Sequence, residues 1–126
     1  MVKLLIIEDD PLIYRMYNRL FVHEGYEVEI ANNGQEGLAK AKTLLPGLIL
    51  LDVMMPTMNG LQALDALKSD PETKEIPVIM LSNLTGEQDT EEALNRGAAK
   101  YIIKSAYEPE EIAAMIKEFL AKQKVL

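Results

Sequence analysis

Short apolar runs alternate along the chain with segments in which apolar residues recur at helical spacing. The apolar runs are rich in Val, Ile and Leu, which is typical of β-strands, and they cover residues 2–7, 26–31, 47–51, 77–81 and 100–103. Between them, apolar residues three or four positions apart predict helices, as in Leu12, Met16 and Leu20, in Leu61, Leu64 and Leu67, and in Ile112, Met115, Ile116 and Phe119. The pattern predicts five strands, each followed by a helix.

Residues at the edges of these segments agree with the predicted helix ends. Asp10 followed by Pro11 is typical of an N-cap and the first helical position. Gly25 and Gly97 stand where the first and fourth helices should end. Two turn signals precede further helices, Asn33-Gly34 and Asn59-Gly60.

Strands that alternate with helices form a parallel sheet covered by helices. The run at 47–51 is apolar without alternation, as in a central strand, whereas polar and apolar residues alternate at 27–30, as in an edge strand. Right-handed crossovers then favour an α/β fold of the flavodoxin-like, doubly wound (βα)5 type. We expect a five-stranded parallel sheet of order 2-1-3-4-5 in one domain, residues 1–126. Ligands bind such sheets at the carboxyl ends of the strands, near the switch between the first and third.

Composition narrows the classes of function. The 126 residues include 13 basic and 20 acidic ones, and the net charge of -7 argues against direct binding to nucleic acid. The sequence has no cysteine and one histidine, His23, which excludes disulfides, thiolate metal sites and multi-histidine metal sites. No apolar run reaches the roughly 18 residues of a membrane span, and the N-terminal run does not fit a secretory signal. We therefore expect a cytoplasmic protein.

Carboxylates gather where two neighbouring strands should end. Glu8, Asp9 and Asp10 follow the first predicted strand, and Asp52 follows the third. Like charges about 4 Å apart repel by about 4 kcal/mol at an effective dielectric constant near 20, so such a cluster needs raised pKa values, splayed side chains or a cation. Oxygen ligands without histidine or cysteine favour Mg²⁺ or Ca²⁺, and a few carboxylates that leave room for water favour Mg²⁺.

Two anion-binding side chains are predicted at the same edge of the sheet. Ser82 follows the fourth strand and Lys104 the fifth, so the edge suits phosphoryl transfer. A carboxylate can itself accept the phosphoryl group, and Asp52 at the middle of the sheet is the best-placed candidate. Taken singly, Asp10 is a helix cap, Ser82 a turn residue and Lys104 a surface lysine. Only the joint placement of these residues at one edge of the sheet favours phosphoryl transfer.

Four motifs that contain these residues resemble the receiver domain of two-component response regulators, in the family's order and at its spacing. They are residues 4–10 (LLIIEDD), 50–60 (LLDVMMPTMNG), 77–82 (PVIMLS) and 97–104 (GAAKYIIK). The second is close to the family's L-D-x-M-M-P-x-M-D-G signature. The resemblance implies that Asp52 is the phosphoacceptor and that the donor is the phosphohistidine of a sensor histidine kinase or a histidine phosphotransfer protein.

The resemblance also implies a role for each residue around Asp52. Glu8 and Asp9 are the acidic pair that holds Mg²⁺, with Asp9 the more direct ligand, and the backbone carbonyl of Met54 completes the metal shell. Lys104 binds the phosphoryl oxygens.

Two further residues are implied as the switch. Ser82 moves toward the phosphoryl group, and Tyr101 turns inward behind it. The exchange is expected to reshape the face formed by the fourth helix, the fifth strand and the fifth helix. A downstream effector protein, or a second copy of the chain in an activation-dependent homodimer, would bind there.

Three residues depart from the family's pattern. Ser105 stands where a proline is usual, often after a cis peptide bond, so the loop geometry after residue 104 stays open. Asn83 stands where a small residue is usual, which leaves the phosphoryl lifetime open. Asn59 replaces a common aspartate at a turn.

These observations predict a phosphorylation-controlled signalling switch of a two-component system or phosphorelay. We expect no turnover of an external substrate, although the protein should catalyse its own phosphorylation and dephosphorylation. The main alternative is a pseudo-receiver, a protein-interaction module that works without phosphorylation. A flavodoxin-like cofactor carrier is disfavoured because the acidic loop at residues 8–11 would repel the cofactor's phosphate. The chain ends just past the last predicted helix, so we expect either that its output is contact with a separate protein or that it is a fragment of a longer chain.

Overall fold

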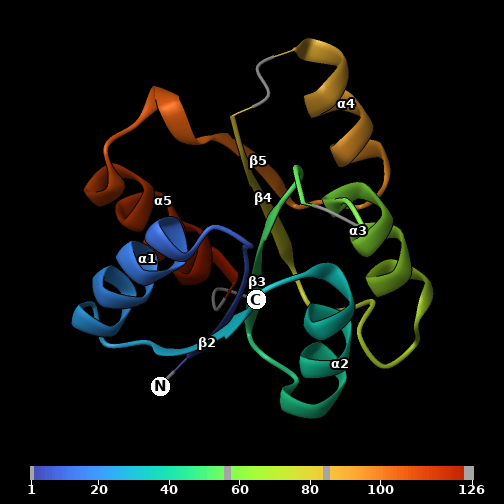
Figure 1. Ribbon diagram of the computed structural model, residues 1–126, viewed down its shortest axis with the longest axis horizontal. Helices are drawn as coiled ribbons and strands as arrows, with labels where there is room; N and C mark the ends of the chain where they lie inside the picture. Colours follow the sequence, from blue (N-terminus) through green and yellow to red (C-terminus); the bar gives the residue numbers. More distant parts are fainter. Residues whose placement is uncertain (1, 56–57, 84–85, 124–126) are drawn as a thin grey trace.

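The computed structural model describes residues 2–55, 58–83 and 86–123 and contains a parallel sheet of order β2-β1-β3-β4-β5 (Figure 1). The strands are β1 (Lys3–Ile7), β2 (Glu27–Ala31), β3 (Leu48–Asp52), β4 (Val78–Ser82) and β5 (Lys100–Ile103). The helices are α1 (Pro11–His23), α2 (Gly34–Leu44), α3 (Gly60–Ser69), α4 (Glu87–Asn95) and α5 (Pro109–Gln123), with a short 3₁₀ turn, η1 (Lys104–Ala106). The predicted fold class and strand order are confirmed. Two residues of the second motif, Pro56 and Thr57, lie outside the described residues.

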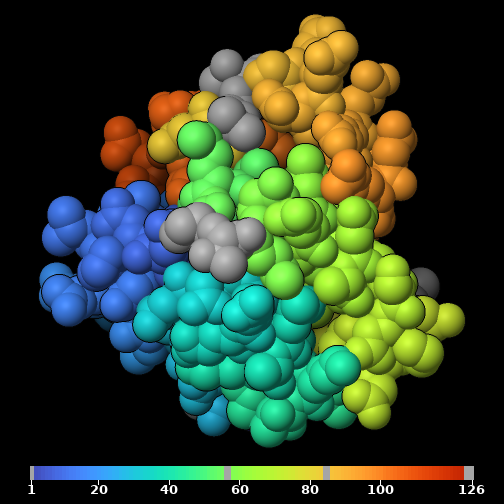
Figure 2. All heavy atoms as spheres, turned by 45° about the vertical axis from the view of Figure 1, so that its right-hand side comes forward, coloured from blue at the N-terminus to red at the C-terminus, as the bar shows by residue number. Residues whose placement is uncertain are grey.

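The sheet lies between two layers of helices. Helices α1 and α5 cover one face, and α2, α3 and α4 cover the other (Figure 1). Because side chains alternate along a strand, Leu4 packs into the core beneath α1 and α5, and Leu5 into the opposite core. Figure 2 shows α2 and α3 side by side on the second face, with α4 beyond α3.

Burial along the strands follows their place in the sheet. Strands β3 and β4 are buried throughout because helices cover both of their faces, as predicted for residues 47–51. Strand β2, at the edge, is mostly half-buried. Strand β1 pairs with both β2 and β3, so the chain changes direction across the sheet at this point. The carboxyl ends of β1 and β3 therefore lie next to each other.

Helix ends are fixed by the residues that the sequence indicated. The Asp10 side chain accepts a hydrogen bond from the backbone N–H of Leu12 at 3.0 Å and caps α1. Gly25, just beyond α1, adopts a φ of 97°, a conformation that side chains with a Cβ disfavour. At the start of α3, Asn59 and Gln62 form a reciprocal capping box.

Helix α1 buries a different stripe from the one that Leu12 and Met16 indicated. Leu12 is 78% exposed and Met16 40% exposed, whereas Tyr17 and Phe21 are buried against the sheet. The two buried rings stack with their centroids 6.0 Å apart. No helix in the described part of the chain is long and apolar enough to cross a membrane.

Candidate functional site

The predicted site residues meet at the carboxyl edge of the sheet. Parallel pairing of β1 with β3, of β3 with β4 and of β4 with β5 brings the strand ends together. The loop after β1 supplies two residues, and β3, β4 and the turn after β5 supply one each: Glu8, Asp9, Asp52, Ser82 and Lys104. Residues up to 96 positions apart in the chain thus share one rim.

Lys104 connects the two acidic strand ends. Its Nζ lies 2.8 Å from Oε1 of Glu8 and 3.7 Å from Oδ1 of Asp52. The three side chains are at most 10% exposed, so water screens the interactions only weakly. The ammonium offsets part of the repulsion that the sequence predicted between the carboxylates.

Backbone groups hold two of the carboxylates in place. The second oxygen of Glu8, Oε2, accepts the N–H of Asp10 at 3.2 Å, so both oxygens of this carboxylate have partners. In the loop after β3, Oδ1 of Asp52 accepts the N–H of Met54 at 3.3 Å. Glu8 is therefore oriented from two sides before any ligand arrives.

Burial and neighbouring charges change the acidity of the site. Burial raises the pKa of Asp52 to about 6; Lys104 opposes the shift, and the charge on Glu8 adds to it. Burial also raises the pKa of Asp9, and the charges on Glu8 and Asp10 act in the same direction. The cluster relieves its repulsion through raised pKa values and a lysine, two of the routes that electrostatics allows.

The acidic residues fit a small, hard cation. Glu8, Asp9 and Asp52 each offer one carboxylate oxygen, and these atoms lie within 4.8 Å of one another. Oxygen atoms alone, with no nitrogen or sulfur donor in the group, are the ligands that Mg²⁺ prefers. Two residues after Asp52, the side chain of Met54 is 61% exposed, whereas that of the next residue, Met55, is buried in the core.

Ser82 and Tyr101 connect the rim to the sheet interior. Ser82 is fully buried at the end of β4. Tyr101, on β5, is half-buried and packs against the core beneath α2 and α3. Burial raises the pKa of Tyr101, and a hydrogen bond with Ser82 opposes this shift. The two residues that the resemblance named as the switch are therefore in contact, and their movement stays a prediction.

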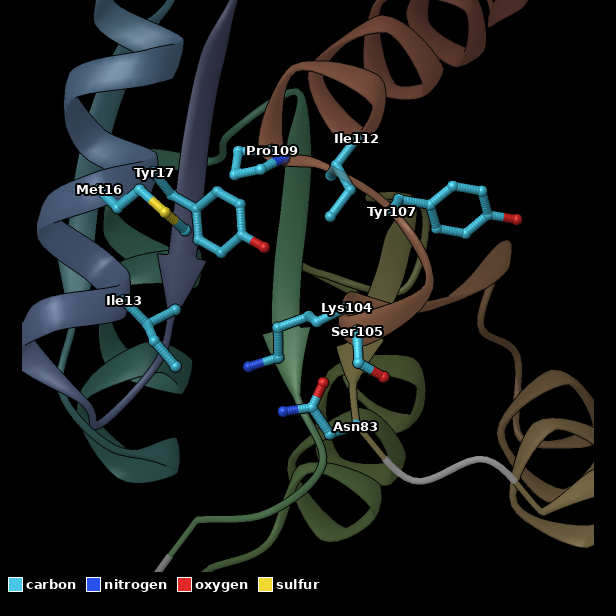
Figure 3. Close-up of a pocket in the computed structure, with 9 residues that line it drawn as sticks. All are labelled: Ile13, Met16, Tyr17, Asn83, Lys104, Ser105, Tyr107, Pro109 and Ile112. Atoms are coloured by element: carbon cyan, nitrogen blue, oxygen red, sulfur yellow. The ribbon is translucent and has the colours of Figure 1, made fainter.

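A pocket of about 270 Å³ opens beside Lys104, between α1 and the η1 turn (Figure 3). Tyr17 contributes to its wall, although sequence patterns had not marked this residue as part of the site. A signal was present, because Ile13, Tyr17 and Phe21 repeat at four-residue spacing just as Leu12, Met16 and Leu20 do.

The residues that depart from the family's pattern also lie at this pocket. Asn83 and Ser105 both line it, next to Lys104. Among the described residues no peptide bond is cis, so the bond between Lys104 and Ser105 is trans. This settles the loop geometry that the sequence left open, and it agrees with the strong preference of non-proline residues for the trans form.

Comparison with known proteins gives one family. Residues 4–117 match the response regulator receiver domain. The DNA-binding dual master transcriptional regulator RpaA of Synechocystis is 36% identical over 122 residues, which are 97% of this chain and 50% of RpaA. Response regulator PleD of Caulobacter vibrioides is 38% identical over 102 residues, 81% of this chain and 22% of PleD. The chain thus spans half the length of these curated relatives or less.

Solved structures agree with this match. A CheY-like receiver domain from Methanospirillum hungatei superposes with a TM-score of 0.89 at 32% identity, over 98% of this chain and 97% of that one. The chemotaxis protein CheY4 of Vibrio cholerae gives a TM-score of 0.87 at 31% identity, over 94% and 98%. The fold, the acidic rim and these similarities lead to one conclusion: the chain belongs to the receiver domains of response regulators, the signalling domains of two-component systems.

Proposed function

We propose that the chain is a switch in which Asp52 accepts a phosphoryl group from the phosphohistidine of a sensor histidine kinase or a histidine phosphotransfer protein. The observation that carries the proposal is the meeting of Asp52, Asp9, Glu8 and Lys104 on one buried rim. This intact set argues against a pseudo-receiver, and no observation favours that alternative.

The surroundings of Asp52 suit a carboxylate nucleophile. With a pKa of about 6 the side chain is mostly ionised at neutral pH, while its burial leaves it poorly hydrated. As one of its oxygens forms the new P–O bond, the P–N bond of the donor breaks and its electron pair goes to the imidazole nitrogen. Lys104 lies close enough to offset the negative charge of the arriving group.

We propose Asp9, Asp52 and the backbone carbonyl of Met54 as direct ligands of Mg²⁺. Glu8 already bonds to Lys104 and to a backbone N–H, so its part is to add negative charge to the metal site and to orient Lys104. Bound Mg²⁺ supplies positive charge that offsets the phosphoryl oxygens.

The switch follows from a change of partners at Ser82. In the present structure Ser82 interacts with Tyr101. A phosphoryl group on Asp52 offers Ser82 a stronger acceptor, and such a difference in contacts between two states is what a population shift requires. Tyr101 then changes its packing, and with it the surface of α4, β5 and α5, where an effector protein or a second copy of the chain would bind. Equal elution volumes on size exclusion, with and without beryllofluoride, would count against the homodimer.

We further propose that residues 1–126 act as one receiver domain in the cytoplasm, with no external substrate, and that the domain catalyses its own phosphorylation and dephosphorylation. The acidic composition supports the view that this chain makes no direct contact with nucleic acid. RpaA, although described as DNA-binding, is twice as long as the region it shares with this chain.

Mass spectrometry tests the central claim. The chain is incubated with Mg²⁺ and acetyl phosphate, and its mass is compared with that of Asp52→Asn and of a charge-matched control, Glu91→Gln, on the exposed side of α4. We expect the mass of one phosphoryl group on the wild type and the control, and none on Asp52→Asn. An unmodified wild type, or an adduct that survives in Asp52→Asn, would contradict the proposal; beryllofluoride binding is a second probe because acyl phosphates hydrolyse.

A further inference from the structure

The pocket beside Lys104 combines an apolar wall with a polar end. Ile13 and Met16 of α1 and Ile112 of α5 contribute apolar side chains, and Tyr17 adds an aromatic ring. Asn83, Lys104 and Ser105 supply an amide, an ammonium and a hydroxyl (Figure 3). A small pocket of this composition suits a flat ring that carries hydrogen-bonding atoms, because its faces are apolar and its edge is polar.

The pocket shares Lys104 with the site of the proposed phosphoacceptor, Asp52. Lys104 lines it, and the Nζ of the same lysine is 3.7 Å from Oδ1 of Asp52. Asn83 directly follows Ser82, which ends the strand next to β3. Lys104 and Asn83 therefore connect the pocket to the place where a phosphoryl group would arrive at Asp52.

Tyr17 is held firmly in the wall. Its side chain is 3% exposed, and its ring stacks on Phe21, which in turn packs against Tyr26. Figure 3 shows the ring projecting from α1 with its hydroxyl directed into the space between α1 and the η1 turn. Within the described part of the chain the hydroxyl makes no hydrogen bond, so it can accept or donate one to a bound group.

We propose that this pocket receives the imidazole ring of the phosphohistidine donor, and that Tyr17 is a positioning residue for the ring. The inference rests on the proposed function. An Asp52 oxygen forms the P–O bond while the P–N bond breaks, and the electron pair of that bond returns to the ring nitrogen. When the other ring nitrogen carries a proton, the ring leaves as neutral imidazole. The Tyr17 hydroxyl and the Asn83 amide oxygen can each accept that N–H.

The proposal predicts a preference among small phosphoryl donors. Phosphoimidazole has the ring as its leaving group, whereas acetyl phosphate releases a small carboxylate that has no flat ring to place. Losing one neutral hydrogen bond in Tyr17→Phe should slow phosphorylation by phosphoimidazole about three- to tenfold. The rate with acetyl phosphate should change by less than about twofold, because Tyr17 makes no contact with that leaving group.

The experiment measures both rates on the whole chain with Mg²⁺, by mass spectrometry of quenched samples. Tyr17→Phe keeps the buried ring, and Asn83→Ala alters an exposed side chain, so neither change should disturb folding. Tyr14→Phe is the matched control, since Tyr14 lies on the same helix but does not line the pocket. We expect Tyr17→Phe and Asn83→Ala to lose rate selectively with phosphoimidazole, and Tyr14→Phe to match the wild type.

Two results would overturn the assignment of the pocket. One is an equal loss with both donors in Tyr17→Phe, which would mean that the residue supports the site in general. The other is no loss with phosphoimidazole in both Tyr17→Phe and Asn83→Ala. A wild type that accepts phosphoryl groups from neither donor would instead contradict the proposed function itself, so the two failures are distinguishable.

Discussion

Replacing Asp52 by asparagine should make the metal-free protein more stable at neutral pH. The carboxylate is buried beside Glu8, and Lys104 compensates only part of the cost, as the raised pKa of about 6 indicates. Asparagine has nearly the same size and can still accept the Met54 N–H bond that now reaches Oδ1 of Asp52. The substitution therefore removes the buried charge and preserves the packing.

The pKa of Asp52 sets the size and the pH window of this effect. A rise from 3.8 to about 6 is about two pKa units, which corresponds to roughly 3 kcal/mol at full strength. Since the rim is not fully closed to water, we expect a gain on the order of 1–3 kcal/mol. Between about pH 4 and 6 the folded wild type binds more protons than the unfolded chain, so its stability falls as the pH rises through that window. The advantage of Asp52→Asn is therefore full above about pH 6 and shrinks toward pH 4.

Urea unfolding followed by far-UV circular dichroism, in EDTA at several pH values, measures this difference. Glu91→Gln removes the same formal charge from an exposed position and should leave the unfolding free energy within about 0.5 kcal/mol of the wild type. Adding Mg²⁺ should stabilise the wild type and narrow its deficit, because a ligand of the folded state adds about RT ln(1 + [L]/Kd). A variant that is no more stable than the wild type in EDTA at neutral pH, or a gain that is equally large at pH 4.5, would refute the reasoning.

Substitutions at four positions test the backbone around the site and elsewhere, each by the same urea assay. Gly60→Ala should lower the free energy of unfolding by on the order of 1–3 kcal/mol, because a Cβ at this position would overlap the backbone carbonyl of Asp52. Gly47→Ala should lower it clearly less, because its Cβ meets chiefly a Val2 methyl group that can move. Equal losses in the two variants would contradict this reasoning. Leu45→Gly should raise the free energy of unfolding by a few tenths to about 1 kcal/mol, because Leu45 is exposed and its φ of 47° strains a residue with a Cβ but not glycine. A lower free energy of unfolding would show that this strain is absent. Asn59→Ala removes the N-cap of α3 and should lower the free energy of unfolding by about 1 kcal/mol, whereas Asn59→Asp keeps a capping oxygen and should retain most of that stability.

The sequence determined the sheet because its signals were local and mutually consistent. Each predicted strand ends within about one residue of the observed one, since apolar β-branched runs leave little freedom. The strand order followed from handedness and from the difference between the alternating run at 27–30 and the uniform run at 47–51. Strand order in turn brought Asp52 beside Glu8, so the acidic rim was predictable without any knowledge of side-chain contacts.

The partners within the rim were harder to predict. Strand order places Lys104 at the same edge as Glu8 and Asp52 but does not say which carboxylate it bonds. The structure gives the closer contact to Glu8, at 2.8 Å against 3.7 Å for Asp52. The contact depends on side-chain length and on the turn after β5, and neither follows from a pattern of apolar residues. This arrangement leaves Asp52 less completely neutralised, which agrees with its raised pKa.

The apolar pattern of helix α1 explains why the sequence did not predict Tyr17 as part of the site. Two stripes, one through Leu12 and Met16 and one through Tyr17 and Phe21, satisfy the same four-residue spacing, and hydrophobicity scales rank leucine and methionine above tyrosine. Only the stripe that faces the sheet can be buried, and the rotation of α1 about its axis places Tyr17 and Phe21 there. A tyrosine on the buried stripe brings a hydroxyl to the edge of the core, where an aliphatic residue would have left the pocket wall apolar. The same rotation therefore exposes Leu12 to solvent and places a hydrogen-bonding group in the pocket that Lys104 also lines.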